Sequence, residues 1–431
     1  MSETLEYPRV EADRSQPSTH PPTVFVPWRL YAYGFILAAF YCVFFLSLYR
    51  AGIWLVDSKG VPINTDFTNF WIAGLQALRG QTALLCDPVE ITRLQQALVG
   101  TGHYVFDNWP YPPTFLLFLA PFSALPYFPA FLTWDLITLL GCSAVVYLIV
   151  RRPWAIALLL ASPFTIWNLS NGQDGLLTAT LLGASLYFLK RHPLVAGLLM
   201  GCLTFKPHLG ILLPVALAAA NQWRAFGAAA TAGALLACAA MAAFGTEVWA
   251  GFPAQLFSEA DESLFVAPDK APIANTGLQT VYGLIRALHG SISLAFLGQL
   301  VVTFGLAIIV WFLWRSTCRY SIKAAVVSAA ALIATPHAYA YDFVVTSITL
   351  AFLAQDQIRF GLLRGEQTIA LGMLAGALVI LVSFGSLPLG PIIIITLLSL
   401  AWRRHLSCWE PGRPPVRIFR KFCEMIPSSG N

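Results

Sequence analysis

Four polar clusters interrupt an otherwise apolar chain, and their residue types suit proton transfer and the stabilisation of an anion. A carboxylate can accept a proton from a nucleophile, whereas lysine and histidine can stabilise developing negative charge. Each cluster follows or separates apolar runs, where ionisable side chains are costly and tend to mark a functional cavity. The clusters are Asp66; Asn171, Gln173 and Asp174; Lys206 and His208; and His337, Tyr341 and Asp342.

Each cluster also has a purely structural interpretation. Asp66 could cap a helix or lie in a solvated loop, and Asn171-Gly-Gln could form a simple turn. Lys206 could extend toward a lipid headgroup, and His337 could cap a helix end. The functional interpretation is favoured because one membrane topology places all four clusters on the same face.

The composition is that of a helical membrane protein. The 431 residues are 57% hydrophobic and only 11% charged, about half the charged share of a soluble domain. Apolar segments of membrane-spanning length recur along most of the chain and are continuous rather than alternating, which favours helices. The net charge of +5 reflects Lys and Arg in loops and tails and gives no indication of nucleic-acid binding. We therefore predict an all-α polytopic membrane protein.

Nothing in the sequence indicates a metal or another cofactor. The 8 cysteines are scattered, and no pair has metal-ligand spacing. Asp57 and Asp87 flank the part of the loop that holds Asp66, but neither forms an Asp-x-Asp pair with it. Asp57 precedes Ser-Lys-Gly and Asp87 precedes a proline, and both patterns are typical of turn residues.

Loops and basic clusters divide the chain into one membrane domain with two polar tails. Residues 1–27 form a cytoplasmic tail without a signal-peptide layout, 28–405 the transmembrane domain, and 406–431 a basic cytoplasmic tail. Two long outer loops, 51–110 and 245–290, interrupt the domain, and the first carries a short amphipathic segment typical of interfacial helices. The positive-inside bias places these basic clusters in the cytoplasm: 151–152, 190–191, 224, 315–319, 359–364 and 403–404.

One apolar segment, residues 111–126, is difficult to fit into this topology. A helix of about 15 residues reaches only about 22 Å, less than the roughly 30 Å of a bilayer core. The segment either forms a re-entrant or buried half-helix, or it spans the membrane. If it spans, the assignment of the other loops to the two faces of the membrane changes. The short apolar halves around Lys206 raise the same question, and a shared cavity would allow them to meet at reduced depth.

The order of the motifs resembles glycosyltransferase family 87. This family has a GT-C fold and is similar to polyprenol-phosphate-mannose-dependent α-mannosyltransferases and to arabinofuranosyltransferases. Each motif is short and weak by itself, but their order is distinctive over about residues 30 to 400. The motifs are Asp66-Phe-Thr-Asn-Phe-Trp, Trp109-Pro-Tyr-Pro-Pro-Thr-Phe, Asn171-Gly-Gln, Thr204-Phe-Lys-Pro-His, Thr335-Pro-His and Tyr341-Asp342.

The resemblance implies a metal-independent, inverting sugar transfer within a bundle of roughly 10–13 transmembrane helices. Asp66 matches the family's essential acid in the first outer loop and is expected to act as general base. Lys206 is the best candidate to bind the donor phosphate. His208 and His337 would add hydrogen-bond donors, and Arg79 would serve either the phosphate or a lipid headgroup. The residues expected to contact the sugar or acceptor are Asn171, Gln173, Tyr341, Asp342 and Tyr111.

The expected partners are a polyprenyl-phosphate sugar, a glycan or glycolipid acceptor, and the lipid bilayer, with no nucleic acid. The expected location is the plasma (inner) membrane, with the active site on the outer face. Mannose is the first choice of sugar because of the family, whereas arabinofuranose or another sugar stays open. Two other functions also stay open: a transporter or flippase of a lipid-linked saccharide, and a scaffold subunit of an envelope assembly.

Overall fold

The computed structural model describes residues 27–100, 109–264 and 277–406. Nearly all of each predicted tail, 1–27 and 406–431, lies outside the described residues. Within the described part, most residues are helical, and strands are confined to a hairpin of β1 (Ile53–Trp54) and β2 (Val56–Asp57).

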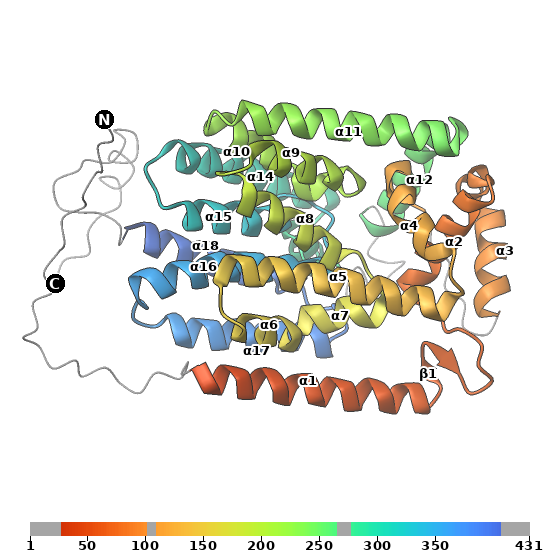
Figure 1. The fold of residues 1–431 in the computed structure, drawn as a ribbon, viewed down its shortest axis with the longest axis horizontal. Coiled ribbons are helices and arrows are strands. Elements are labelled where there is room, and N and C mark those ends of the chain that lie inside the picture. Colours follow the sequence, from red (N-terminus) through yellow and green to blue (C-terminus); the bar gives the residue numbers. More distant parts are fainter. Residues whose placement is uncertain (1–26, 101–108, 265–276, 407–431) are drawn as a thin grey trace, which may run out of the picture.

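Helices that run between two ends of an elongated bundle form the body of the molecule (Figure 1). Several of these passes are built from two shorter pieces joined at a break. The passes are α1 (Pro27–Arg50), α5 (Tyr127–Val150), α6 (Trp154–Ala161) with α7 (Pro163–Asn171), α8 (Gly175–Phe188), α9 (Pro193–Cys202) with η3 (Leu203–Phe205), η4 (Pro207–Gly210) with α10 (Leu213–Ala219), α11 (Trp223–Phe244), α14 (Ile292–Arg315), α15 (Tyr320–Ile333), α16 (Thr346–Phe360), α17 (Glu366–Val382) and α18 (Gly390–Leu406).

The long helices have the length and the surface of membrane spans. Among the described residues, 4 helices are long and apolar enough to cross a bilayer: α1, α5, α11 and α14. The outer side of α14 exposes large apolar side chains such as Leu297, Val301 and Phe304, which are 59%, 63% and 66% exposed. In water such a surface would be costly, whereas lipid chains cover it without penalty. The predicted all-α polytopic class is therefore confirmed, and the number of crossings stays a prediction.

Short helices and the hairpin gather at one end of the bundle, which we call the Asp66 end (Figure 1). The first loop contributes two of the acids there as turn residues, as their sequence context predicts. Asp57 Oδ1 accepts hydrogen bonds from the backbone N–H groups of Lys59 and Val61, at 2.8 and 2.9 Å. Asp87 caps α3 by accepting from the Val89 N–H at 2.9 Å. The short elements are α2 (Asp66–Leu78), η1 (Thr82–Cys86), α3 (Pro88–Val99), η2 (Pro113–Phe115), α4 (Leu116–Ser123), α12 (Glu247–Ser263) and α13 (Val281–Ala287).

Residues 111–126 do not cross the bundle. Their helix α4 packs against α2 so closely that a Cβ added to Gly74 would lie 2.2 Å from Ser123 Oγ. The next helix, α5, begins at the same end, because the Tyr127 hydroxyl is 3.0 Å from Thr65 Oγ1. The segment therefore enters and leaves at the Asp66 end, as a buried half-helix would. The structure does not show this segment as a full span.

A buried ion-pair network ties four helices together at the opposite end, which we call the basic end. Arg404 of α18 is 1% exposed and donates to Glu366 of α17 and to Asp356 of α16, with distances of 2.6 and 2.7 Å. Asp356 also pairs with Arg319 at 3.2 Å and accepts from Ser321 of α15 at 2.8 Å. Because the buried charges have opposite partners at short distance, the network tolerates burial, and removing one partner would leave an unpaired charge.

Candidate active site

The first turn of α2 fixes the position of Asp66. Asp66 is the first residue of the helix, and Thr65 precedes it as N-cap. The Thr65 backbone N–H donates to Thr68 Oγ1 at 3.1 Å, and the Tyr127 hydroxyl lies 3.0 Å from Thr65 Oγ1 and 3.2 Å from Thr68 Oγ1. Phe67 is 1% exposed and packs into the core. The carboxylate is therefore held at the start of a helix, where the backbone dipoles favour negative charge.

Asp66 lines a cavity of about 590 Å³ at its end of the bundle. The walls come from the first loop, the turn between α7 and α8, the break between η3 and η4, and the loop before α16. Nearly all residues that the sequence predicts for the site meet here, although they are up to 275 positions apart (341 minus 66). The predicted residues in the lining are Asp66, Tyr111, Asn171, Gln173, Lys206, His208, His337 and Tyr341.

The Asn171-Gly-Gln motif is a turn and also a wall of the cavity. Gln173 Nε2 donates to Asp66 Oδ2 at 2.7 Å, while Gln173 Oε1 accepts from the Asp174 backbone N–H at 3.2 Å. Gly172 has φ of +64°, and a Cβ there would lie 2.6 Å from the Cβ of Phe67. A residue with a side chain would be strained and would push the turn away from α2. Glycine therefore allows Gln173 to reach the carboxylate.

Burial raises the pKa of the Asp66 carboxyl above its usual range, and the neighbouring charge of Asp174 adds to this effect. The hydrogen bond from Gln173 and the positive charge of Lys206 lower the pKa and oppose part of the increase. A carboxylate with a raised pKa is a stronger base than an exposed one. The environment therefore suits Asp66 to accept a proton from a hydroxyl group.

Lys206 occupies the break between η3 and η4 and is paired with two buried acids. Its Nζ atom is 2.5 Å from Asp174 Oδ1 and 2.7 Å from Asp342 Oδ1, and its side chain is 4% exposed. The ring of Tyr341 lies 5.0 Å from Nζ. Asp342 is held further by the Tyr339 backbone N–H, which donates to Oδ2 at 3.0 Å. Through these contacts, the break between η3 and η4 is held against the start of α8 and against the loop before α16.

This pairing adds a structural role for Lys206 and Asp342, and the roles in binding that the sequence predicts for them stay predictions. The charge of Lys206 is already balanced by two carboxylates, so the ammonium is not the uncompensated cation that a phosphate would need by itself. Asp342 is 1% exposed, is absent from the residues lining the cavity and pairs with Lys206. Sequence could not show this, because the partners are 32 and 136 positions away from Lys206.

Two histidines of the cavity lining lie next to each other. The ring centroids of His208 and His337 are 5.8 Å apart, and the rings are nearly perpendicular, at 89°. His208 Nε2 is buried and has no hydrogen-bond partner among the described residues. A buried polar nitrogen without a partner costs free energy unless a ligand or water satisfies it. His208 is therefore well placed to contact a bound oxyanion.

The structure does not bring Arg79 to this cavity. Arg79 is exposed and caps the far end of α2, a 13-residue helix that extends roughly 20 Å from Asp66. Its position fits the headgroup role that its amphipathic segment also suggested. From the 111–126 segment, Tyr111 and Pro112 line the cavity, whereas Phe115 is fully buried and stacks on Phe205, with ring centroids 4.8 Å apart.

Several residues at the site carry no chemical signal in the sequence. Tyr127 anchors the start of α2, but a tyrosine at the beginning of an apolar run is not distinctive. Apolar side chains from α12 and from the turn between α17 and α18 also line the cavity, and only the tertiary fold brings these segments together. These lining residues are Phe252, Leu256 and Phe384.

The fold and the cavity define a class: a polytopic helical membrane protein with an acid-lined site at one end of its bundle. A model of glycosyltransferase family 87 matches residues 109–336, more than half of the chain. The chain therefore belongs to glycosyltransferase family 87 and is a membrane glycosyltransferase. No curated protein and no solved structure matches it.

Proposed function

We propose that the protein transfers a sugar from a polyprenyl-phosphate donor to a hydroxyl group of an envelope glycan or glycolipid, with Asp66 as general base. One observation carries the proposal. Asp66 is the only acid among the described residues that line the cavity, whereas Asp174 and Asp342 are paired with Lys206. The family supplies the reaction class, and the cavity offers one carboxylate to perform it.

A single accessible carboxylate supports inversion. Asp66 takes the proton from the acceptor hydroxyl while the oxygen of that hydroxyl bonds to the anomeric carbon. The bond from the anomeric carbon to the phosphate oxygen breaks at the same time. The phosphate leaves with the electron pair from the opposite side of the sugar. A mechanism with retention would need a second carboxylate about 5 Å away to act as nucleophile. The arrangement of the described acids therefore favours a single displacement, which inverts the configuration at the anomeric carbon.

The departing phosphate would meet donors on the opposite wall of the cavity. His208 and His337 can donate hydrogen bonds, and Lys206 has a third N–H beyond the two used by its acids. Asn171, Gln173, Tyr111 and Tyr341 would contact hydroxyl groups of the sugar or acceptor. Mannose is the proposed sugar, and the donor requires no metal ion in this scheme.

We further propose the orientation that the charges favour. The basic end lies in the cytoplasm and the Asp66 end faces the outside of the plasma membrane, within a GT-C domain spanning residues 28–405. The loops 51–110 and 245–290 are then the outer loops, and a lipid-linked donor enters the cavity from the outer leaflet.

The direct test is a product assay on the protein in lipid nanodiscs with a panel of polyprenyl-phosphate sugars. We expect a mass increase of one hexose on a glycolipid acceptor with the mannose donor, and the same yield in EDTA. Nucleotide sugars are the matched control donors and should give no product. Turnover with nucleotide sugars alone would contradict the proposal, and movement of an intact lipid-linked saccharide would indicate the flippase instead.

The raised pKa of Asp66 predicts how activity changes with pH. A general base acts only when deprotonated, so kcat/KM should fall as pH drops through the pKa of this carboxyl, at a higher pH than for an ordinary Asp. Gln173→Leu removes a hydrogen bond that lowers this pKa, so the acidic limb of the profile should shift to higher pH. Asn171→Leu is the matched control: the Asn171 amide donates to Trp167 and Ser170 rather than to Asp66, so the acidic limb should not move even if kcat/KM falls at every pH. A profile unchanged by Gln173→Leu would contradict the assignment.

A further inference from the structure

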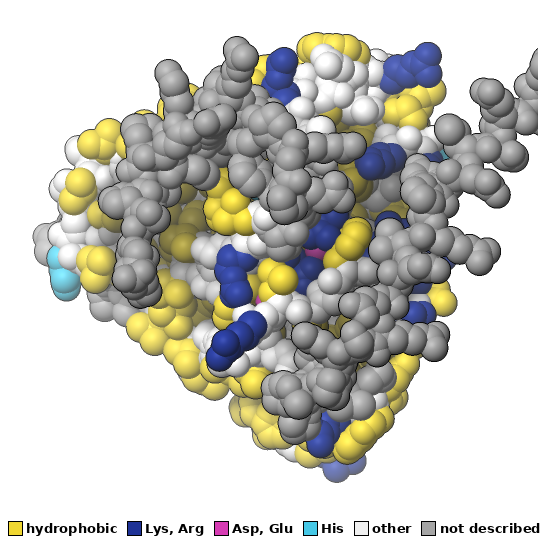
Figure 2. Space-filling view, turned by 90° about the vertical axis from the view of Figure 1, so that its left-hand side faces the viewer, with side chains coloured by type: hydrophobic (Ala, Val, Ile, Leu, Met, Phe, Trp, Pro, Cys, Tyr) yellow, Lys and Arg dark blue, Asp and Glu magenta, His cyan; other side chains and the backbone are white. Residues whose placement is uncertain are grey.

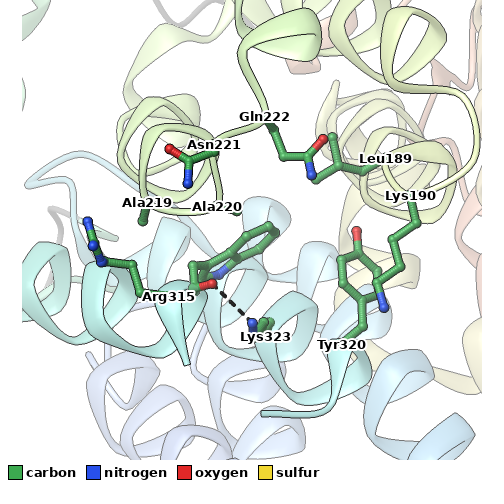
Figure 3. Close-up of a pocket in the computed structure, with 10 residues that line it drawn as sticks. Leu189, Lys190, Ala219, Ala220, Asn221, Gln222, Arg315, Tyr320 and Lys323 are labelled. Atoms are coloured by element: carbon green, nitrogen blue, oxygen red, sulfur yellow. Dashed lines mark hydrogen bonds between the residues drawn. The ribbon is translucent and has the colours of Figure 1, made fainter. Parts of the chain in front are cut away.

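A second cavity lies at the basic end, far along the bundle from Asp66. Its volume is about 360 Å³, and it is bounded by the ends of α8, α10 and α14 and by the starts of α11 and α15 (Figure 3). Figure 2 views the molecule from this end and shows Lys and Arg side chains spread over it, with little acidic surface. The lining consists of Leu189, Lys190, Ala219, Ala220, Asn221, Gln222, Trp314, Arg315, Tyr320 and Lys323.

The lining is strongly basic and contains no acid. Lys190, Arg315 and Lys323 all contribute, and none of them forms an ion pair with a carboxylate among the described residues. By contrast, Arg404 and Arg319 at the same end are paired with buried acids. An anion in the cavity would relieve this uncompensated positive charge.

Neutral groups hold these cations in place without neutralising them. Lys323 Nζ donates to the carbonyl oxygens of Trp314 and Ser316 at 3.0 and 2.7 Å, and the first of these bonds is visible in Figure 3. Lys190 Nζ lies 4.7 Å from the centroid of the Tyr320 ring. A lysine that uses two of its three donors on carbonyl oxygens keeps its full charge and one N–H for a ligand. The cavity is thus a preformed cationic site.

An unsatisfied donor in the lining also indicates a ligand. The Trp314 side chain is 4% exposed, and its indole Nε1 is buried without a hydrogen-bond partner among the described residues. Indole N–H groups usually find an acceptor when they are buried. The amides of Asn221 and Gln222 lie on the side of the pocket opposite Arg315 and Lys323 in Figure 3 and offer further donors.

We infer that this cavity binds a phosphate group, contributed by the headgroup of an anionic phospholipid. Basic pockets between the ends of membrane helices bind such headgroups, and this cavity lies among helix ends at the basic end of the bundle. The cations would pair with the phosphate oxygens, while the indole and amide groups would donate hydrogen bonds to oxygens of the headgroup. This site is separate from the proposed catalytic cavity and does not depend on the sugar that is transferred.

Native mass spectrometry of the delipidated full-length protein tests the site, with phosphatidylglycerol, phosphatidylcholine and inorganic phosphate as probes. We expect phosphatidylglycerol to bind in preference to phosphatidylcholine. The double variant Lys190→Ala/Arg315→Ala should bind it about 30-fold more weakly, because each lost cation reduces attraction to an anionic lipid. Trp314→Phe, which removes the indole donor but keeps an aromatic ring, should weaken binding by about 3- to 5-fold.

The matched control is Arg152→Ala/Arg191→Ala, which removes the same charge from exposed positions at the same end that do not line the cavity. Thermal unfolding of each variant establishes that it folds. If inorganic phosphate competes with phosphatidylglycerol, the phosphate group alone is recognised. If it does not compete, binding requires the rest of the lipid as well. Either result supports the site. Equal binding of the two lipids, or an equal loss in the control variant, would overturn the inference.

Discussion

Replacing Asp66 with Asn is expected to lower kcat for sugar transfer by about 100- to 10,000-fold, the range for loss of a general base. The substitution keeps the size of the side chain and an oxygen that can accept the Gln173 hydrogen bond. It removes the negative charge and the ability to take a proton from the acceptor. Turnover of purified wild-type and variant protein under saturating donor and acceptor measures the effect.

Asp57→Asn is the matched control for this experiment. Asp57 lies in the same loop, but its carboxylate accepts hydrogen bonds within a turn and does not line the cavity. Its activity should stay within about 2-fold of wild type, since surface substitutions have small effects. Size-exclusion profiles and thermal unfolding establish that both variants fold. Retained turnover in Asp66→Asn and in Asp66→Ala would remove Asp66 as the base.

Lys206→Met is expected to destabilise the protein by about 3 to 5 kcal/mol, because it leaves two buried acids without a counter-charge. Asp174 and Asp342 are 0% and 1% exposed, so water cannot replace the lysine. Methionine keeps an unbranched apolar stem of similar length, which limits the loss of packing. Thermal unfolding in detergent, compared with wild type under the same conditions, measures the change.

The triple variant Lys206→Met/Asp174→Asn/Asp342→Asn separates the structural role from a role in binding. Neutralising both acids removes their unpaired charge, so stability should return toward that of the wild type. If Lys206 also contacts the donor phosphate, the stable triple variant should show a raised KM for the donor. An unchanged unfolding temperature for Lys206→Met alone would contradict the ion-pair interpretation.

The sequence predicts well which residues meet in the candidate site, because the signals of these residues are local and chemically distinctive. Polar residues are rare in this apolar chain, so Asp66, Gln173, Lys206 and His337 could each be recognised at a break between helices. The alternation of basic clusters assigns these breaks to one end, and in the structure all four residues line a single cavity. The all-α class followed from composition and from the length of the apolar runs.

The sequence predicts less well how these residues pair, because pairing depends on side chains that are distant in the chain. The sequence makes Lys206 the best candidate to bind the donor phosphate, but it does not show that Asp342, 136 positions away, accepts a hydrogen bond from it. The sequence leaves Arg79 with either a phosphate or a headgroup role, and the length of α2 separates it from Asp66. Tyr127 gave no signal, because hydroxyl groups that anchor a helix look like ordinary aromatic residues of a membrane span.

The network around Arg404 also makes the packing of two earlier helices depend on the last helix of the bundle. Asp356 and Glu366 are translated before α18, so their main counter-charge does not yet exist when α16 and α17 leave the ribosome. Burying two acids without Arg404 is costly, so these helices can complete their packing only after α18 has been inserted.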